Sequence, residues 1–182
     1  WKTDTKKIRP EVAVLQEPFG NAVHVAAQAP IKGATVAIFG LGPIGMFDVL
    51  IARGLGAKKI IGVDPNPAAR AMAKKLGIDD ALDTAKPNAV LSRQSPATAD
   101  KPAHARDQAV VERILALTNG IGADVSLEMS GYNSSLNTAI HSTRRGGTVV
   151  LFGVKNGDMV LEDYNALILR GISMHAVVGR RV

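Results

Sequence analysis

The sequence predicts an α/β protein with a doubly wound, six-stranded parallel sheet in a single domain. Short apolar runs alternate along the chain with segments of helical periodicity, as expected for parallel strands joined by crossover helices. Hydrophobic residues make up 46% of the 182 residues and aromatic residues only 4%. The core must therefore consist of small aliphatic side chains, which are typical of strands buried on both faces. A glycine-rich turn directly after the first strand is the third observation.

The elements are expected in a regular order, beginning with a connecting segment at residues 1–30. That segment should carry two short helices, one that begins at Pro10 and breaks at Pro18, and one from Asn21 to about Gln28. The domain proper spans residues 31–182, and its crossovers predict the strand order 3-2-1-4-5-6. The strands are expected at residues 35–39, 60–64, 81–82, 124–129, 148–152 and 172–178. The helices between them are expected at residues 43–53, 67–76, 107–118, 134–144 and 162–169.

Two features interrupt or end these elements. Gly77 should close the helix at 67–76, and Gly146-Gly147 should close the helix at 134–144. The stretch from Lys86 to Arg106 contains three prolines and no apolar periodicity. We interpret residues 86–106 as an exposed surface insertion, with a functional lid as the alternative.

The turn after the first strand has the spacing G-x-G-x-x-G. Gly40 permits the tight turn, Gly42 lets a pyrophosphate approach the backbone, and Gly45 lets the following helix pack closely. That helix begins at Pro43, and its free N–H groups favour the binding of an anion. We expect Ile44 to lie under the bound molecule. The turn therefore predicts a dinucleotide site.

The second strand ends in Asp64, which follows Gly45 by 19 positions. A carboxylate about 20 residues past the turn meets the adenosine ribose hydroxyls in dinucleotide-binding domains. It would also repel a 2′-phosphate, so NAD is favoured over NADP. The alternative is that Asp64 caps the helix at 67–76.

Composition argues against other function classes. The net charge of +6 comes from scattered pairs of basic residues, and only two tyrosines and one tryptophan are available for base stacking. We therefore expect no nucleic-acid partner. No apolar run of about 18 residues is present, so no membrane association is expected. The absence of cysteine excludes thiolate metal sites and disulfides within these residues and fits a cytoplasmic location.

Several segments resemble the zinc-dependent medium-chain dehydrogenases, and among them the branch of the L-threonine 3-dehydrogenases. The resemblance covers nearly the whole chain except residues 86–106. Its most specific part is the segment QEPFGNAVH, which begins at Gln16. The other matching segments are residues 40–45, 73–77, 118–125, 127–131 and 177–180.

The resemblance implies the NAD-binding Rossmann domain of a larger oxidoreductase. The full-length enzyme would transfer hydride from a secondary alcohol to NAD, with zinc held by a catalytic domain that these residues lack. L-threonine, oxidised to 2-amino-3-ketobutyrate, is the substrate that the resemblance favours. A polyol or another secondary alcohol, and a dinucleotide-sensing module without catalysis, remain alternatives. We expect no metal site within these residues and no turnover by this part alone.

The resemblance also assigns individual residues. It places Glu17 beside the catalytic zinc, where a carboxylate can relay a proton; the alternative is an exposed glutamate near a helix end. In the threonine dehydrogenases an arginine approaches the ribose, and Arg70 stands one position beyond the place of that arginine. The alternative is that Arg70 is a solvated surface charge. A homo-oligomer is expected to pair through the edge strand at 172–178. The residues that would border the nicotinamide are Phe152, Gly153, Val154, Val177 and Val178, which are otherwise read as buried strand residues.

Overall fold

The computed structural model describes residue 4 and residues 6–84, 105–154 and 157–179. Within these residues, six parallel strands form one sheet in the order β3-β2-β1-β4-β5-β6. The predicted fold class and strand order are therefore confirmed. The predicted insertion at 86–106 lies outside the described residues except for its last two, so its exposure stays a prediction.

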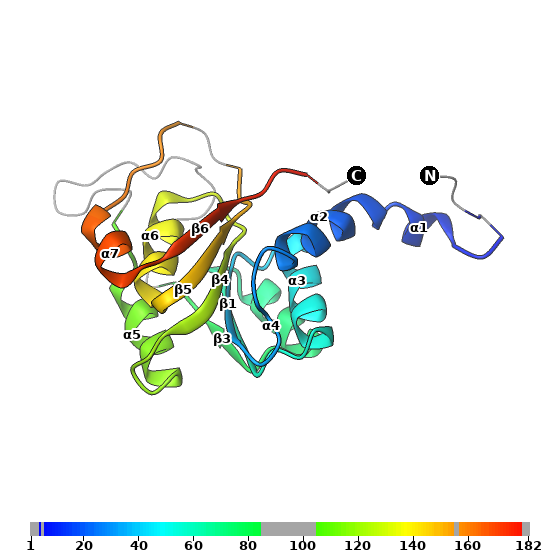
Figure 1. The fold of residues 1–182 in the computed structure, drawn as a ribbon. Helices are drawn as coiled ribbons and strands as arrows, with labels where there is room; N and C mark the ends of the chain where they lie inside the picture. The colour runs from blue at the N-terminus through cyan, green and yellow to red at the C-terminus, as the bar shows by residue number, and fades with distance from the viewer. Residues whose placement is uncertain (1–3, 5, 85–104, 155–156, 180–182) are drawn as a thin grey trace.

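The strands alternate with helices along the chain (Figure 1). The strands are β1 (Thr35–Phe39), β2 (Lys59–Val63), β3 (Asp80–Leu82), β4 (Ala123–Glu128), β5 (Thr143–Leu151) and β6 (Ser173–Ala176). The helices are α1 (Pro10–Ala13), α2 (Gln16–Ala26), α3 (Pro43–Gly54), α4 (Pro67–Leu76), α5 (Gln108–Leu117), α6 (Asn133–Ser142) and α7 (Tyr164–Arg170). No helix among the described residues is long and apolar enough to cross a membrane.

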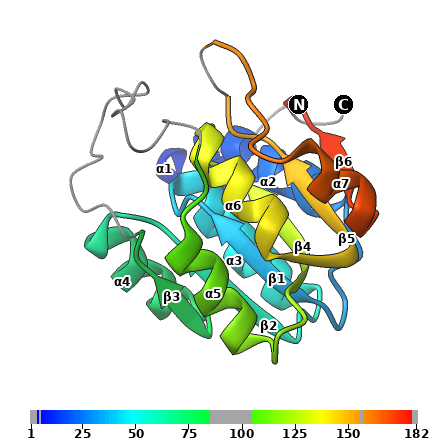
Figure 2. The same ribbon diagram turned by 90° about the vertical axis from the view of Figure 1, so that its left-hand side faces the viewer.

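Helices cover both faces of the sheet, with α5 and α6 in front of it in Figure 2. On β1, Val36 and Ile38 pack with α2, α3 and α4, whereas Ala37 and Phe39 pack with α5, α6 and α7. This alternation follows from the period of two residues in a strand. Burial of a Val, Ile or Phe side chain contributes about 1.5–3 kcal/mol to stability. Two aliphatic cores therefore hold the strand ends in fixed places.

The helices that precede the sheet differ from the prediction, because the chain does not break at Pro18. Pro18 lies in the first turn of α2, where its missing N–H would have no partner within the helix. The break comes earlier, between Ala13 and Gln16. α2 then packs on α3, and the rings of Phe19 and Phe47 meet edge to face at 5.4 Å.

The end of α6 was also predicted wrongly. α6 ends at Ser142, and β5 begins at Thr143 and includes Gly146 and Gly147. A side chain on Gly147 would place its Cβ 2.9 Å from the carbonyl oxygen of Asp124 in β4. Gly147 therefore serves the close approach of two strands rather than the end of a helix. Gly77 closes α4 in the left-handed conformation, as predicted.

Candidate dinucleotide-binding site

The glycine turn lies between β1 and α3 at the carboxyl edge of the sheet. Gly40 has a φ of +99°, and a Cβ on Gly45 would lie only 2.1 Å from the Gly40 carbonyl oxygen. These two glycines are required by the protein's own packing. Gly42 is different, because it is exposed and nothing lies within 4 Å of its Cβ position. The space above Gly42 is therefore open to a ligand, as a dinucleotide site requires.

The N-terminus of α3 faces the same edge. Gly42 is its N-cap residue, Pro43 is its first residue, and no side chain caps this terminus. The first N–H groups of a helix are not used by the helix itself, and they carry its partial positive charge. Ile44 is half-buried in the first turn. The terminus thus has the form of an anion site.

Asp64 lies directly after β2 and connects the loop there to the glycine turn. Its Oδ2 accepts a hydrogen bond from the N–H of Leu41 at 2.7 Å, and its Oδ1 accepts one from the N–H of Asn66 at 2.7 Å. The alternative role as a cap of α4 is wrong, since Asn66 caps that helix through the N–H of Ala68. A carboxylate accepts about four hydrogen bonds, so Asp64 retains capacity for ribose hydroxyls.

Arg70 is not the solvated surface charge that was its alternative interpretation. Its Nη1 donates to the backbone carbonyl of Asp64 at 2.6 Å, and its Nη2 lies 3.0 Å from Asp83 Oδ2. Only 17% of its side chain is exposed. Arg70 therefore fixes the backbone beside the predicted ribose position, while its own contact with a cofactor stays a prediction.

Sequence reasoning missed Glu128, the last residue of β4. Its side chain is buried, and it accepts hydrogen bonds from the N–H groups of Ser130 at 3.0 Å and Gly131 at 3.1 Å. The hydroxyls of Ser130 and Ser135 also donate to it, the latter at 2.9 Å. Burial raises the pKa of Glu128, while these donors act in the opposite direction. The signal available in the sequence was an acid at the end of an apolar strand, directly before Met-Ser-Gly.

The loops after β4 and β5 touch each other above Glu128. A Cβ on Gly131 would lie 2.4 Å from the carbonyl oxygen of Val154, and one on Gly153 would lie 2.1 Å from the Gly131 nitrogen. A Cβ on Gly153 would also lie 2.7 Å from Glu128 Oε2. Neither loop can carry a larger residue at these positions without moving.

The residues predicted to border the nicotinamide all follow the last residue of β5 or β6. Val154 and Val178 are highly exposed, so the alternative that they are buried strand residues is wrong. Phe152 and Val177 are half-buried and pack against the core on the α3 side. Their location fits the carboxyl edge, where open α/β sheets bind ligands.

Glu17 is exposed in the first turn of α2. The amide Nδ2 of buried Asn21 donates to Glu17 Oε1 at 2.8 Å, which orients the carboxylate. His24 ties the same helix to the segment after β6 through a 2.8 Å hydrogen bond between its Nδ1 and the carbonyl of Gly179. In the described part of the chain, no three His, Asp or Glu side chains gather to hold a metal ion.

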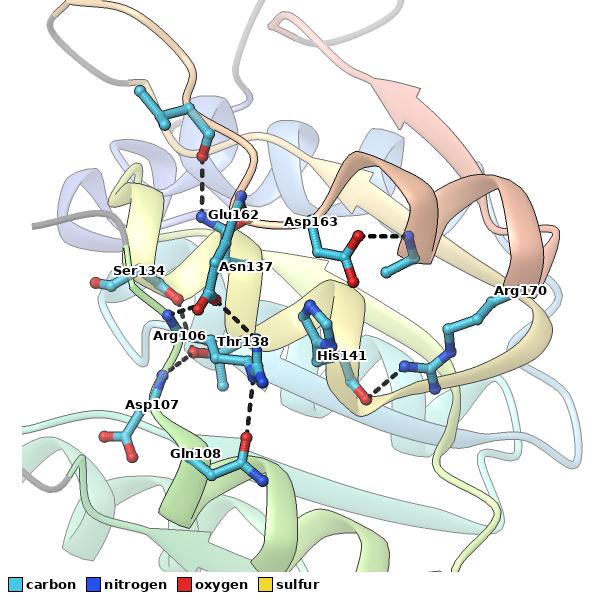
Figure 3. Close-up of polar contacts among 12 residues, drawn as sticks. Arg106, Asp107, Gln108, Ser134, Asn137, Thr138, His141, Glu162, Asp163 and Arg170 are labelled. Atoms are coloured by element: carbon cyan, nitrogen blue, oxygen red, sulfur yellow. Dashed lines mark hydrogen bonds and ion pairs between the residues drawn. The ribbon is translucent and has the colours of Figure 1, made fainter. Parts of the chain in front are cut away.

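A second polar cluster connects the loop after β5 and the segment before α5 to buried polar residues of α6 (Figure 3). Asn137 accepts a hydrogen bond from the N–H of Glu162 at 3.0 Å, and Glu162 forms an ion pair with Arg106 at 3.1 Å. The N–H of Asp107 donates to Thr138 Oγ1 at 2.8 Å. The two contacts of Glu162 hold the far end of the loop that begins after Leu151, and the Asp107 contact joins the start of α5 to α6.

A hollow at the opposite edge of the sheet is not the dinucleotide site. It lies at the amino ends of the strands, and its lining includes Thr35, Lys59, Asp79 and Asp124. In its wall, Lys59 lies 3.0 Å from Asp80, and Asp79 and Asp124 are each paired with an arginine. The glycine turn and Asp64 are not among its lining residues.

The fold and the glycine turn can now be compared with known proteins. The family model of the zinc-binding dehydrogenases matches residues 43–181. The chain belongs to the zinc-binding dehydrogenase family. Over all 182 residues it is 31% identical to L-threonine 3-dehydrogenase of Pyrococcus horikoshii, and it spans 46% of that relative. The chain thus covers about half the length of the curated relatives it matches.

Solved structures of the family superpose on most of this chain. An alcohol dehydrogenase of Thermotoga maritima matches with a TM-score of 0.78 at 26% identity, over 100% of this chain and 46% of that chain. L-idonate 5-dehydrogenase of Escherichia coli matches with 0.73 at 30% identity, over 96% and 43%. A zinc-binding dehydrogenase of Sinorhizobium meliloti, solved bound to NADP, matches with 0.68 at 25% identity, over 91% and 44%. The chain therefore corresponds to the dinucleotide-binding domain of a zinc-type dehydrogenase.

Proposed function

We propose that this domain binds NAD for an enzyme that transfers hydride from a secondary alcohol, with L-threonine as the substrate. The observation that carries the proposal is the open Gly42 at the uncapped N-terminus of α3, next to Asp64. The 31% identity to an L-threonine 3-dehydrogenase supports the substrate, whose oxidation gives 2-amino-3-ketobutyrate. The small-molecule partner is thus an amino alcohol.

The chain's own residues have separate tasks in this proposal. The α3 N-terminus binds the pyrophosphate, and Asp64 accepts hydrogen bonds from the ribose hydroxyls and repels a 2′-phosphate. When bound, the nicotinamide supplies the hydride acceptor. Glu17, oriented by Asn21, accepts the proton that the alcohol oxygen loses and passes it to solvent. Zinc would be held by residues outside this chain and, when bound, would polarise the alcohol oxygen.

A polyol or another secondary alcohol, such as a polyhydroxylated acid, is the second candidate substrate. The identity to L-idonate 5-dehydrogenase, 30% over 96% of this chain, nearly equals that to the threonine enzyme. The two substrates differ in charge at the carbon beside the reacting one, so turnover of L-threonine against sorbitol by the full-length enzyme separates them. The cytoplasmic location and the lack of a nucleic-acid partner stay predictions.

Replacement of Asp64 tests the choice of cofactor. Asp64→Ala should weaken NADH binding about tenfold, the value of roughly one charge-assisted hydrogen bond, and reduce discrimination against NADPH. Titration of nicotinamide fluorescence with each cofactor measures both effects. Asp83→Ala is the matched control, because it removes the other carboxylate near Arg70 and should leave the preference intact. Equal affinities of wild type and Asp64→Ala for both cofactors would contradict the assignment.

We also propose that two copies pair through β6. β6 is at the edge of the sheet, and three of its four residues are exposed. An edge strand offers unpaired backbone groups to a second copy. The expected mass in solution is about 38 kDa, twice the 19.1 kDa of the chain, by light scattering after gel filtration. A mass of one chain at micromolar concentration would rule out this pairing.

A further inference from the structure

Glu128 is a buried carboxylate whose partners are all neutral. Only 3% of the residue is exposed, and its hydrogen-bond donors are two backbone N–H groups and two serine hydroxyls. None of the ion pairs formed by the described residues includes it. Several donors directed at a carboxylate favour its ionised form. They oppose the rise in the pKa of Glu128 that burial causes, so the carboxylate can ionise in place without a neighbouring cation.

The charge lies where three loops of the site meet. The backbone of Gly153 approaches Glu128 Oε2, and the Ser130-Gly131 turn donates to the same carboxylate. The glycine turn reaches this point too, since a Cβ on Gly40 would lie 3.1 Å from the Ser130 nitrogen. Glu128 thus supports the loops after β1, β4 and β5 from below.

We propose that Glu128 is a positioning residue that also makes the site prefer the oxidised, cationic nicotinamide over the neutral reduced ring. This inference rests on the proposed function and on the nicotinamide position beside Gly153 and Val154 that the family resemblance implies. NAD⁺ and NADH differ only in the nicotinamide ring, which carries a positive charge in NAD⁺ and none in NADH. A fixed negative charge near the ring therefore favours the binding of NAD⁺ over that of NADH. Water screens a buried charge much less than an exposed one, and its effect extends through one layer of backbone.

Glu128→Gln keeps the size of the side chain and removes its charge. Wild type and variant are titrated with NAD⁺, NADH and ADP, the first and last by calorimetry and NADH by fluorescence. The ratio of the dissociation constants of NADH and NAD⁺ should fall about threefold to tenfold in the variant, in favour of NADH. ADP lacks the nicotinamide, so its affinity should stay within about twofold.

Two matched carboxylate variants serve as controls. Glu162→Gln removes a charge from the cluster on α6, and Asp48→Asn replaces another buried carboxylate, on α3. Both should leave the NADH to NAD⁺ ratio unchanged. A folded Glu128→Gln variant with the wild-type ratio overturns the proposal. An equal loss of affinity for all three ligands also overturns it, because a merely structural role would have that effect.

Glu128→Asp keeps the charge and shortens the side chain, so it also serves if Glu128→Gln does not fold. We expect the wild-type ratio with weaker binding of both NAD⁺ and NADH, because the shorter acid loses contact with the turn. Unchanged affinities in this variant overturn the positioning role. Failure of the wild type to bind any of the three ligands at millimolar concentration instead overturns the proposed function, and the two failures are thereby distinguished.

Discussion

Glu128 and Asp48 are the same chemical group in contrasting surroundings. Both carboxylates are buried, at 3% and 0% exposure, and burial raises the pKa of both. Glu128, at the end of β4, is surrounded by donors. Asp48, on the inner side of α3, has no hydrogen-bond partner for either oxygen among the described residues. Donors, rather than depth of burial, therefore decide which of the two can carry a charge in the folded protein.

The contrast divides the roles of the two residues. Burial raises the pKa of Asp48 to about 8, so the folded protein keeps it protonated at neutral pH. Asp48 is therefore a neutral, buried side chain of α3, and it contributes no charge to the candidate dinucleotide site. Glu128, whose carboxylate accepts several hydrogen bonds, lies below the loops at the carboxyl edge of the sheet. An unsatisfied acid is tolerated where only packing is required, at a cost in stability.

The largest expected change in stability comes from replacing Asp48. The unfolded chain ionises it near the ordinary pKa of 3.8, and the folded chain only at about 8. The folded state therefore binds more protons, and the wild type loses stability as pH rises between these values. Asp48→Ala should remove this loss. The free energy of unfolding of the variant, taken relative to that of the wild type, should therefore rise by on the order of 4 kcal/mol from pH 4 to pH 8. Urea unfolding across this pH range measures it.

Asp48→Asn separates charge from packing in the same experiment, since it has nearly the same shape and does not ionise. Its stability relative to the wild type should rise with pH in parallel with that of Asp48→Ala. A difference from the wild type that stays constant from pH 4 to pH 8 would show that Asp48 does not change its ionisation on folding.

A smaller effect is expected from the donors of Glu128. Ser135→Ala removes one hydroxyl hydrogen bond of 2.9 Å and should cost about 1 kcal/mol of stability, measured by urea unfolding at pH 7. It should also raise the pKa of Glu128 further. Ser134→Ala is the control on the same turn of α6, because its hydroxyl is not among the donors to Glu128. Equal stability of the two variants would mean that the Ser135 contact contributes nothing.

Local patterns were sufficient for the order of the sheet and the outline of the site. Alternating strand and helix periods predicted β1 to β6, and glycine spacing with Asp64 predicted the carboxyl edge. Helix boundaries were less accurate, because Pro18 is tolerated in a first turn and Gly147 is needed for contact between strands. Arg70 was placed near the ribose, but its partner Asp83 comes from the end of another strand.

The sequence by itself determined the fold class, the glycine turn after β1 and the acid that follows β2 at position 64, since each depends on short-range spacing along the chain. Only the tertiary structure decided the states of the two buried acids. Asp48 occurs in an ordinary helical pattern, and packing alone removes it from water. The surroundings of Glu128 come from three elements: Ser130 in the loop after β4, Ser135 in α6 and Gly153 in the loop after β5. Burial and the supply of donors are set by groups from several elements, so no local pattern in the sequence reports them.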